Sequence, residues 1–320
     1  MAATLIYAFL NGTNDSGGLV ATAISSRSLT PRVAMTLASL AEFAGPFLFG
    51  TAVAATIGKG LVQVSLLSGS TLLVAIVSAI AWNLAAQYFG VPSSSTHALL
   101  GGLIGAVLIA HGSDALILGG FARVLLALFI APLIGWLVSY VFMRLVKRLT
   151  QQASPRINSI FKHIQVLNVV TLALSHGTND GQKSMGLIVL ALAVGKYQTD
   201  FTVPLWATLA CATALTLGVR LGGWRIIRTM GESIYRLRPI HAFAAQTASA
   251  SVVLIAALLG TPVSTSQVVS MAIIGVGSAD RINAVRWLIT GRIIAAWIIT
   301  IPASALVAML IQYAFVRNGY

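Results

Sequence analysis

The chain has 320 residues, of which 57% are hydrophobic and only 8% charged, and its formal net charge is +13. Soluble domains carry roughly 25% charged residues, so these few charges exclude a water-soluble globular protein. The apolar runs are long and continuous, whereas the strands of a membrane β-barrel alternate over about ten residues. We therefore expect an all-α polytopic membrane protein, in which each helix satisfies its own backbone hydrogen bonds.

Ten apolar runs follow one another along the chain as candidate spans. They cover residues 4–24, 33–57, 70–89, 96–110, 115–143, 164–194, 202–219, 242–259, 264–276 and 285–315. A helix that crosses an apolar layer of ~30 Å needs about 20 residues. Several runs are shorter or longer than this, or contain Gly, Asn, Asp or Pro, so broken or re-entrant helices are expected among them.

The loops between these runs differ in charge. Fourteen basic residues lie in four loops, at 27–32, 144–162, 220–238 and 281–286. The opposite side receives only Lys59, Lys196 and Arg317. Cytoplasmic loops are enriched in Lys and Arg, so we predict a multi-pass protein of the plasma (inner) membrane with both termini outside. The positive-inside rule also accounts for most of the net charge, so no nucleic acid partner is expected.

Two motifs occur twice, once in each half of the chain. GTND stands at 12–15 and again at 177–180, and GVPSSST at 90–96 resembles GTPVSTS at 260–266. Each half holds five runs, an odd number, so the second half must be inverted relative to the first. We predict an inverted-topology repeat of about 5+5 spans: a first repeat at 1–143, a cytoplasmic linker at 144–163 and a second repeat at 164–320. Secondary transporters have this architecture, with substrate bound near the membrane midplane.

The GTND motifs each place an aspartate inside an apolar run. An ionised Asp there costs at least ~2.5–3.5 kcal/mol on insertion scales, so it needs a cation, a basic side chain or a proton. Carboxylate, amide and unwound backbone oxygens suit a hard cation such as Na⁺. A pair of helix caps is the alternative interpretation. The residues predicted to bind Na⁺ are Asn11, Asn14, Asp15, Asn179 and Asp180.

The two Pro-Ser/Thr clusters are predicted to begin helices. A helix N-terminus offers unpaired N–H groups and a partial positive charge, which together bind anions, and hydroxyl groups add donors. Plain capping and hydrogen bonding between helices is the alternative. Two such helix N-termini, meeting from opposite sides of the membrane, would surround a tetrahedral oxyanion. The predicted anion ligands are Ser94, Ser95, Thr96, Ser264, Thr265 and Ser266, together with Asp15 and Asp180.

Three more polar residues lie in or beside apolar runs. Gln182 and Lys183 directly follow the second GTND, where the first half has two glycines. A buried Lys is costly unless it faces a cavity or an anion, so Lys183 is predicted to pair with an aspartate or to contact the substrate, with Gln182 beside it. Glu42 is a possible proton or cation site. Catalytic motifs such as Walker or HExxH sequences are absent, so no enzyme is expected.

Several stretches resemble one known family. NGTNDSGGLVATAISSRSLTPR, SHGTNDGQKSMGLIVLAL, GTPVSTSQVVS and NAVRWLITGRIIAAWIITIPA are similar to the inorganic phosphate transporter (PiT) family, most of all to its prokaryotic low-affinity members. The resemblance implies an inverted repeat that carries phosphate by symport with Na⁺ or H⁺, in some bacterial members as a metal–phosphate complex. It also implies that the Asn/Asp pairs hold the coupling ions and that the Ser/Thr clusters contact phosphate.

The sequence departs from the family pattern at three places. Gly18 stands where the family often has Asn, and Ser266 and Gln267 replace a usual Thr-His, while the residue at Glu42 is often Asn. These differences leave the coupling cation and the choice of anion open. The leading prediction is a cation-coupled phosphate symporter that works by alternating access and forms a homodimer. The alternatives are a permease for sulfate or another oxyanion and, more weakly, a non-transporting receptor or structural partner.

Overall fold

The computed structural model describes residues 1–154 and 156–317. Within those residues the chain forms helices and no β-strand, apart from one isolated bridge between Val62 and Leu116. The helices are α1 (Ala2–Ser25), α2 (Pro31–Leu48), α3 (Ala52–Lys59), α4 (Gly69–Phe89), α5 (Ser95–His111), α6 (Leu118–Leu149), α7 (Ile157–His176), α8 (Gln182–Val194), α9 (Leu205–Leu221), α10 (Trp224–Arg228), α11 (Pro239–Leu258), α12 (Thr265–Arg281) and α13 (Trp287–Arg317). Two π-helical turns, η3 (Gly177–Gly181) and η4 (Thr229–Ser233), and three short 3₁₀ turns, η1 (Val64–Leu66), η2 (Ser113–Ala115) and η5 (Ile282–Ala284), complete them.

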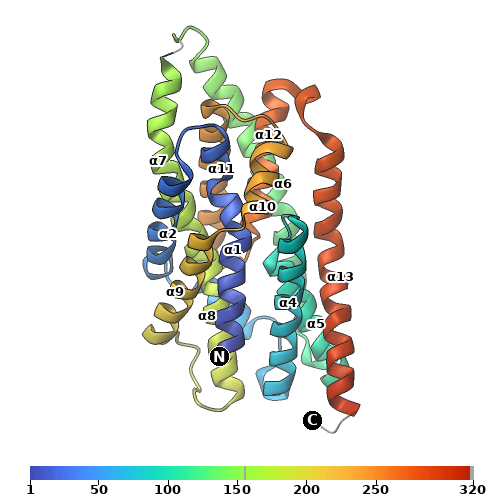
Figure 1. Cartoon of the computed structure of the whole chain (residues 1–320). Coiled ribbons are helices and arrows are strands. Elements are labelled where there is room, and N and C mark those ends of the chain that lie inside the picture. The colour runs from blue at the N-terminus through green and yellow to red at the C-terminus, as the bar shows by residue number, and fades with distance from the viewer. Residues whose placement is uncertain (155, 318–320) are drawn as a thin grey trace.

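The helices run roughly parallel in an elongated bundle (Figure 1). Five described segments are long and apolar enough to cross a membrane: α4, α6, α7–α8, α11 and α13. Two further crossings arise when the bent pairs are joined, α2–α3 with a bend of 74° and α9–α10 with a bend of 60°. The predicted all-α membrane fold with broken helices is therefore confirmed.

Two pairs of helices turn back inside the bundle. In Figure 1, α4 and α5 meet near mid-height and open toward the lower end, whereas α11 and α12 open toward the upper end. Both turns begin with a glycine in the left-handed region, Gly90 at φ +66° and Gly260 at φ +67°, as is usual just after a helix ends. The second helix of each pair has only 17 residues, which is short for a complete crossing.

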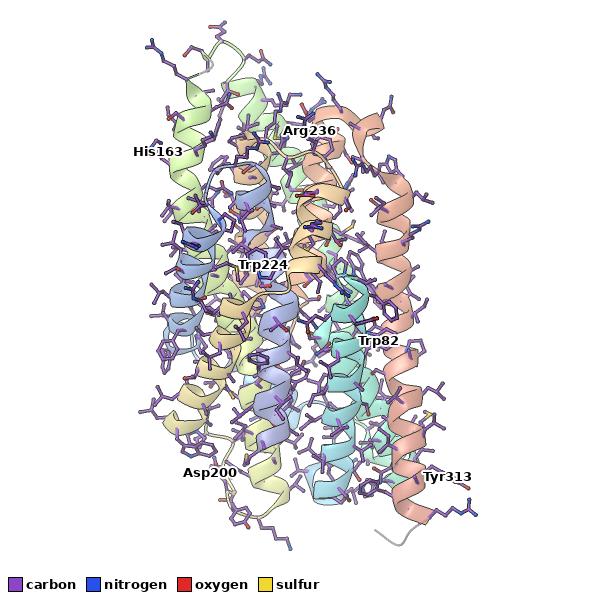
Figure 2. The ribbon with its side chains drawn as sticks, in the orientation of Figure 1. Trp82, His163, Asp200, Trp224, Arg236 and Tyr313 are labelled. Atoms are coloured by element: carbon purple, nitrogen blue, oxygen red, sulfur yellow. The ribbon has the colours of Figure 1, made fainter. Side chains whose placement is uncertain are left out.

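The ends of the bundle carry different residues. Figure 2 shows His163 and Arg236 at the upper end and Asp200 and Tyr313 at the lower end. The start of α1 and the end of α13 both lie at the lower end (Figure 1). The predicted linker at 144–163 is mostly helical, because α6 continues to Leu149 and α7 begins at Ile157.

At least two basic residues predicted in a cytoplasmic loop lie elsewhere, Arg220 in the last turn of α9 and Arg225 in α10. Trp224 lies near mid-height (Figure 2), so Arg225 directly follows the bend between α9 and α10 and is not in an end loop. Its guanidinium donates to the carbonyl of Tyr88 at the end of α4 and stacks on the Tyr88 ring at 5.2 Å. The prediction failed here because α9 is too short to cross alone, and α10 continues the crossing after the bend.

Helices α1 and α9 cross with their backbones in close contact. A Cβ added to Gly12 would overlap the carbonyl oxygen of Leu215, and one added to Gly218 would overlap that of Phe9. Only glycine permits this approach, because any side chain would force the two backbones apart. The first GTND motif therefore uses its glycine for packing, and α1 continues without a break through Asp15.

Helices α2 and α7 cross in the same way. A Cβ on Gly45 would overlap the carbonyl oxygen of Leu174, and one on Gly177 would overlap that of Glu42. The glycine of the second GTND motif thus lies against the backbone that carries Glu42. These two crossings bring both GTND motifs into the centre of the bundle.

Candidate functional site

The centre of the site is the imidazole of His176, at the end of α7. Its Nε2 atom lies 3.3 Å from Asp15 Oδ2 and 3.1 Å from Asp180 Oδ2, and its Nδ1 atom lies 2.7 Å from Glu42 Oε1. All four side chains are buried. The two aspartates of the GTND motifs are thus brought together, as their repetition predicted, and a histidine joins them to the predicted acidic site at Glu42.

The second GTND motif occupies the π-helical turn η3. Such turns often occur at functional sites, because they change which groups the backbone presents. The Thr178 hydroxyl donates to the carbonyl of Gly45 at 2.9 Å and to that of Leu174 at 2.8 Å. Asn179 accepts from Val263 N–H at 3.2 Å and donates to the Thr261 carbonyl at 3.1 Å. The amide of Asn179 therefore fixes the α11–α12 turn to the break between α7 and α8.

The start of α12 faces both aspartates. The Ser266 hydroxyl donates to Asp15 Oδ1, and the Thr265 hydroxyl donates to Asp180 Oδ2 at 3.1 Å. Ser264 is the N-cap residue, and its carbonyl accepts from Val268 N–H at 3.0 Å. The second Ser/Thr cluster therefore lies against the carboxylates, and its predicted contact with an anion stays a prediction.

The start of α5 reaches the same region. Ser94 caps the helix by accepting from His97 N–H at 3.1 Å, and the Ser95 carbonyl accepts from the Tyr7 hydroxyl at 3.0 Å. The Thr96 hydroxyl accepts from the ammonium of Lys183 at 2.7 Å. The Ser95 hydroxyl is buried and has no hydrogen-bond partner among the described residues. It is a free donor and acceptor at the start of α5.

Gln182 lies apart from this group. Its Oε1 atom accepts from Val53 N–H at 2.8 Å, and its Nε2 atom donates to the Gly50 carbonyl at 2.7 Å. Both polar atoms therefore satisfy backbone at the bend between α2 and α3, where a broken helix leaves such groups without partners. These contacts give Gln182 a structural role, and its predicted contact with the anion stays a prediction.

Asn11 and Asn14 lie on α1 beside the carboxylates. Both are buried, and Asn14 Nδ2 donates to the Asn83 carbonyl at a long 3.4 Å. Among the described residues, the side-chain oxygens of Asn11, Asn14 and Asn83 and the side-chain nitrogens of Asn11 and Asn83 have no hydrogen-bond partner. Buried polar atoms are rarely left without partners, so these amides are free to bind a ligand, and their oxygens suit a cation.

The donor set fits a cation. Asp15, His176 and Asp180 each offer one ligand atom, and these atoms lie within 4.8 Å of one another. Two carboxylates with nearby amide oxygens suit a hard cation, and the imidazole between them is a group that can carry a proton. The arrangement can therefore hold a cation or a proton close to an anion.

His176, Tyr7 and Asn83 were not predicted from the sequence. His176 directly precedes the second GTND motif, and that position was the available signal. The first motif has Asn11 at the equivalent place, so the repeat itself gave no reason to single out the histidine. Tyr7 and Asn83 stand in ordinary apolar runs without any motif.

Comparisons with known proteins agree on one family. The model of the phosphate transporter family matches residues 11–308. A probable low-affinity inorganic phosphate transporter of Rhizobium meliloti is 39% identical over 98% of this chain and 95% of its own length. The protein of the same description from Bacillus subtilis is 38% identical over 94% of this chain and 91% of its own length.

The fold has a solved relative as well. A sodium-dependent phosphate transporter superposes with a TM-score of 0.88 at 26% identity, with 98% of this chain and 97% of that chain covered. On the match to the family model and these near-complete alignments, the chain belongs to the phosphate transporter family, which confirms the resemblance and the prediction of a transporter rather than an enzyme.

Proposed function

We propose that the chain carries inorganic phosphate across the plasma membrane by symport with a monovalent cation. One observation carries this proposal. Two aspartates from distant parts of the chain meet at His176, beside the starts of α5 and α12. Carboxylates attract a cation, and helix starts with hydroxyl groups attract an anion. A site that holds both at once couples the movement of one to the movement of the other.

Phosphate fits this site better than sulfate does. Phosphate near neutral pH still carries a proton and donates it in a hydrogen bond to a carboxylate, whereas sulfate has no proton to donate. Asp15 and Asp180 lie beside the Ser/Thr clusters, so a bound anion meets acceptors as well as donors. A permease for sulfate or another oxyanion is the second candidate, and a metal–phosphate complex is a variant of the first.

Sodium is the coupling cation that we favour, with a proton as the alternative. The structural relative is described as sodium-dependent, and Asn11 and Asn14, whose side-chain oxygens are unpartnered, lie on the same helix as Asp15. The predicted sodium ligands are Asn11, Asn14, Asp15, Asn179 and Asp180. Of these we propose Asn11, Asn14 and Asp15 for the exchangeable ion, because Asn179 already bonds to the α11–α12 turn and Asp180 to the Lys183 ammonium. Glu42 is reached through His176 and is the proposed site for a proton.

An inverted repeat of 1–143 and 164–320 is part of the proposal. Its support lies in the two crossings, in which Gly12 pairs with Gly218 and Gly177 pairs with Gly45. In both pairs, each glycine lies against the backbone carbonyl of the residue three positions before the other glycine. In one crossing α1 of the first repeat packs on α9 of the second. In the other, α7 of the second repeat packs on α2 of the first, as two-fold symmetry requires. The two hairpins open toward opposite ends (Figure 1). Such repeats move by rocking one part against another around a central site, which is alternating access.

The test is uptake of radiolabelled phosphate by purified protein in liposomes, with a sodium gradient and a pH gradient imposed separately. We expect uptake with one of the two gradients. Asp15→Asn and Asp180→Asn should each reduce it by at least about tenfold, because the carboxylate charge is removed from the cation site. Asp200→Asn, in the exposed lower loop, is the matched control and should leave uptake unchanged.

Other results would assign the function differently. Uptake that unlabelled sulfate blocks and unlabelled phosphate does not would make the protein a sulfate permease. Folded protein that takes up neither anion with either gradient would contradict transport and favour a receptor or structural partner. The predicted homodimer remains a prediction, which the mass of the detergent-solubilised protein would test.

A further inference from the structure

Lys183 is one of the largest fully buried side chains of the protein. It lies one turn after Asp180 on α8, in the centre of the bundle. A buried ammonium is costly unless oxygens replace its water shell. The neighbours of Lys183 therefore decide what the ammonium does at the site.

Three oxygens surround the Lys183 ammonium. They are a carboxylate oxygen of Asp180, the hydroxyl oxygen of Thr96 at 2.7 Å and the carbonyl oxygen of Val263 at 2.5 Å. They come from three separate elements, namely the η3 turn, the start of α5 and the turn before α12. A carboxylate, a hydroxyl and a backbone carbonyl at broken helices are the oxygen types that bind sodium ions in transporters.

These contacts use the whole donor capacity of the lysine. An ammonium group has three N–H donors, and three acceptors are in place. No donor remains for an oxygen of phosphate. Direct contact with the anion, one of the two roles predicted from the sequence, would require Lys183 to give up one of these partners.

The other GTND motif has no equivalent charge. Gly18 stands three residues after Asp15, as Lys183 does after Asp180, and an added Cβ there would meet only ordinary contacts beyond 3.6 Å. The side-chain oxygens of Asn11 and Asn14 are without partners on this side. The half that contains Asp15 thus has no lysine at this position, and the basic group at Asp15 is His176, which it shares with Asp180. The half that contains Asp180 has the Lys183 ammonium in addition.

We propose that the Lys183 ammonium is a built-in cation, held in an oxygen site that would otherwise take a monovalent metal ion beside Asp180. The proposal rests on the cation coupling proposed above. It makes the protein asymmetric: the Asp15 half exchanges its cation during transport, and the Asp180 half keeps a tethered one. The transporter therefore moves one cation fewer per phosphate than a site with two exchangeable positions.

The test measures binding of ²²Na⁺ to the purified full chain in detergent, without phosphate. Lys183→Met keeps the length of the side chain and removes the charge. We expect it to bind one more sodium ion per chain than the wild type, because the three oxygens of Asp180, Thr96 and Val263 that hold the ammonium lose their partner. Lys183→Arg keeps a fixed charge and should give no gain. In Asp180→Asn/Lys183→Met the carboxylate is gone too, and the gain should disappear.

Two results would overturn the proposal. One is a folded Lys183→Met protein that binds no additional sodium, and the other is a gain in Lys183→Arg. If Lys183→Met is unfolded in choline chloride, we expect NaCl to restore a monodisperse protein with a higher Tm. Failure of NaCl to restore it would also overturn the proposal. The sodium-binding assay does not depend on transport. A failure of phosphate uptake in liposomes would therefore contradict the proposed function without changing the sodium-binding result.

Discussion

His176 connects acidic side chains from three helices. Glu42 of α2 lies at one ring nitrogen, and Asp15 of α1 and Asp180 of η3 lie at the other. Without the ring, three buried acids would face one another with only hydroxyl groups and Lys183 as partners. A like charge disfavours ionisation of its neighbour, so the histidine allows these carboxylates to stay close and ready for a cation.

We predict that His176→Gln loses phosphate uptake by at least about tenfold, since one amide cannot replace two ring nitrogens that act on opposite sides. The measurement is liposome uptake at equal amounts of folded protein. His163→Gln is the matched control, because His163 lies exposed at the upper end and its ring contacts the Ser159 carbonyl of its own helix. Unchanged uptake in His176→Gln would remove the histidine from the mechanism.

At the scale of helices, the two glycine crossings set the positions of the acids. Gly12 and Gly177 each lie three residues before the aspartate of their motif. The atoms that an added methyl group would meet belong to backbone, which cannot move aside as a flexible side chain does. Moving these helices apart would also move Asp15 and Asp180.

We predict that Gly177→Ala and Gly12→Ala each destabilise the protein, by about 1–3 kcal/mol as is typical of overpacking. Thermal unfolding of the detergent-solubilised protein measures this as a lower Tm. Gly291→Ala on α13 is the control, because nothing lies within 4 Å of its added Cβ. Its Tm should equal or exceed that of the wild type. A wild-type Tm for Gly177→Ala would show that the α2–α7 crossing is looser than the structure indicates.

The sequence predicted the apolar helices and the meeting of the two motifs, but not the local form of each motif. Both GTND copies were expected to offer unwound backbone oxygens to a cation. Only the second departs from the α-helix, and there Thr178 donates to the Gly45 carbonyl of another helix. The contacts of Gln182 could not be predicted from the sequence either, because its partners lie at the bend between α2 and α3, next to Val53. Contacts between distant segments decide both features, and no local pattern contains them.

At the scale of the whole molecule, we propose from the distribution of charge which end of the bundle faces which side of the membrane. The loop between α6 and α7 lies at the upper end, and the loop between α8 and α9 lies at the lower end (Figure 1). Basic residues are concentrated in the former, which follows the positive-inside rule if the upper end is cytoplasmic. Both termini are then proposed to lie outside.

Cysteine labelling tests this orientation with little engineering, because the one native cysteine, Cys211, is buried. We predict that a membrane-impermeant maleimide applied to right-side-out vesicles labels Tyr197→Cys in the lower loop and not Gln151→Cys in the upper one. Opening the vesicles should make both reactive, because only the membrane protects the upper loop. The wild-type chain should stay unlabelled throughout. The reverse pattern would invert the proposed topology.

The backbone contact at Gly12 and Gly218 also determines how α1 can move. With no side chain between the helices, their separation is fixed and the crossing angle is the softer coordinate, so the contact acts as a pivot. Asp15 lies only ~4.5 Å along the axis from this pivot, while the far end of α1 at Ser25 lies ~20 Å away. A tilt of about 20° would displace the carboxylate by ~1.5 Å and the helix end by ~7 Å. The distances from the pivot are thus unequal, so the Ser25 end of α1 can move by several ångströms while the Asp15 carboxylate stays nearly in place.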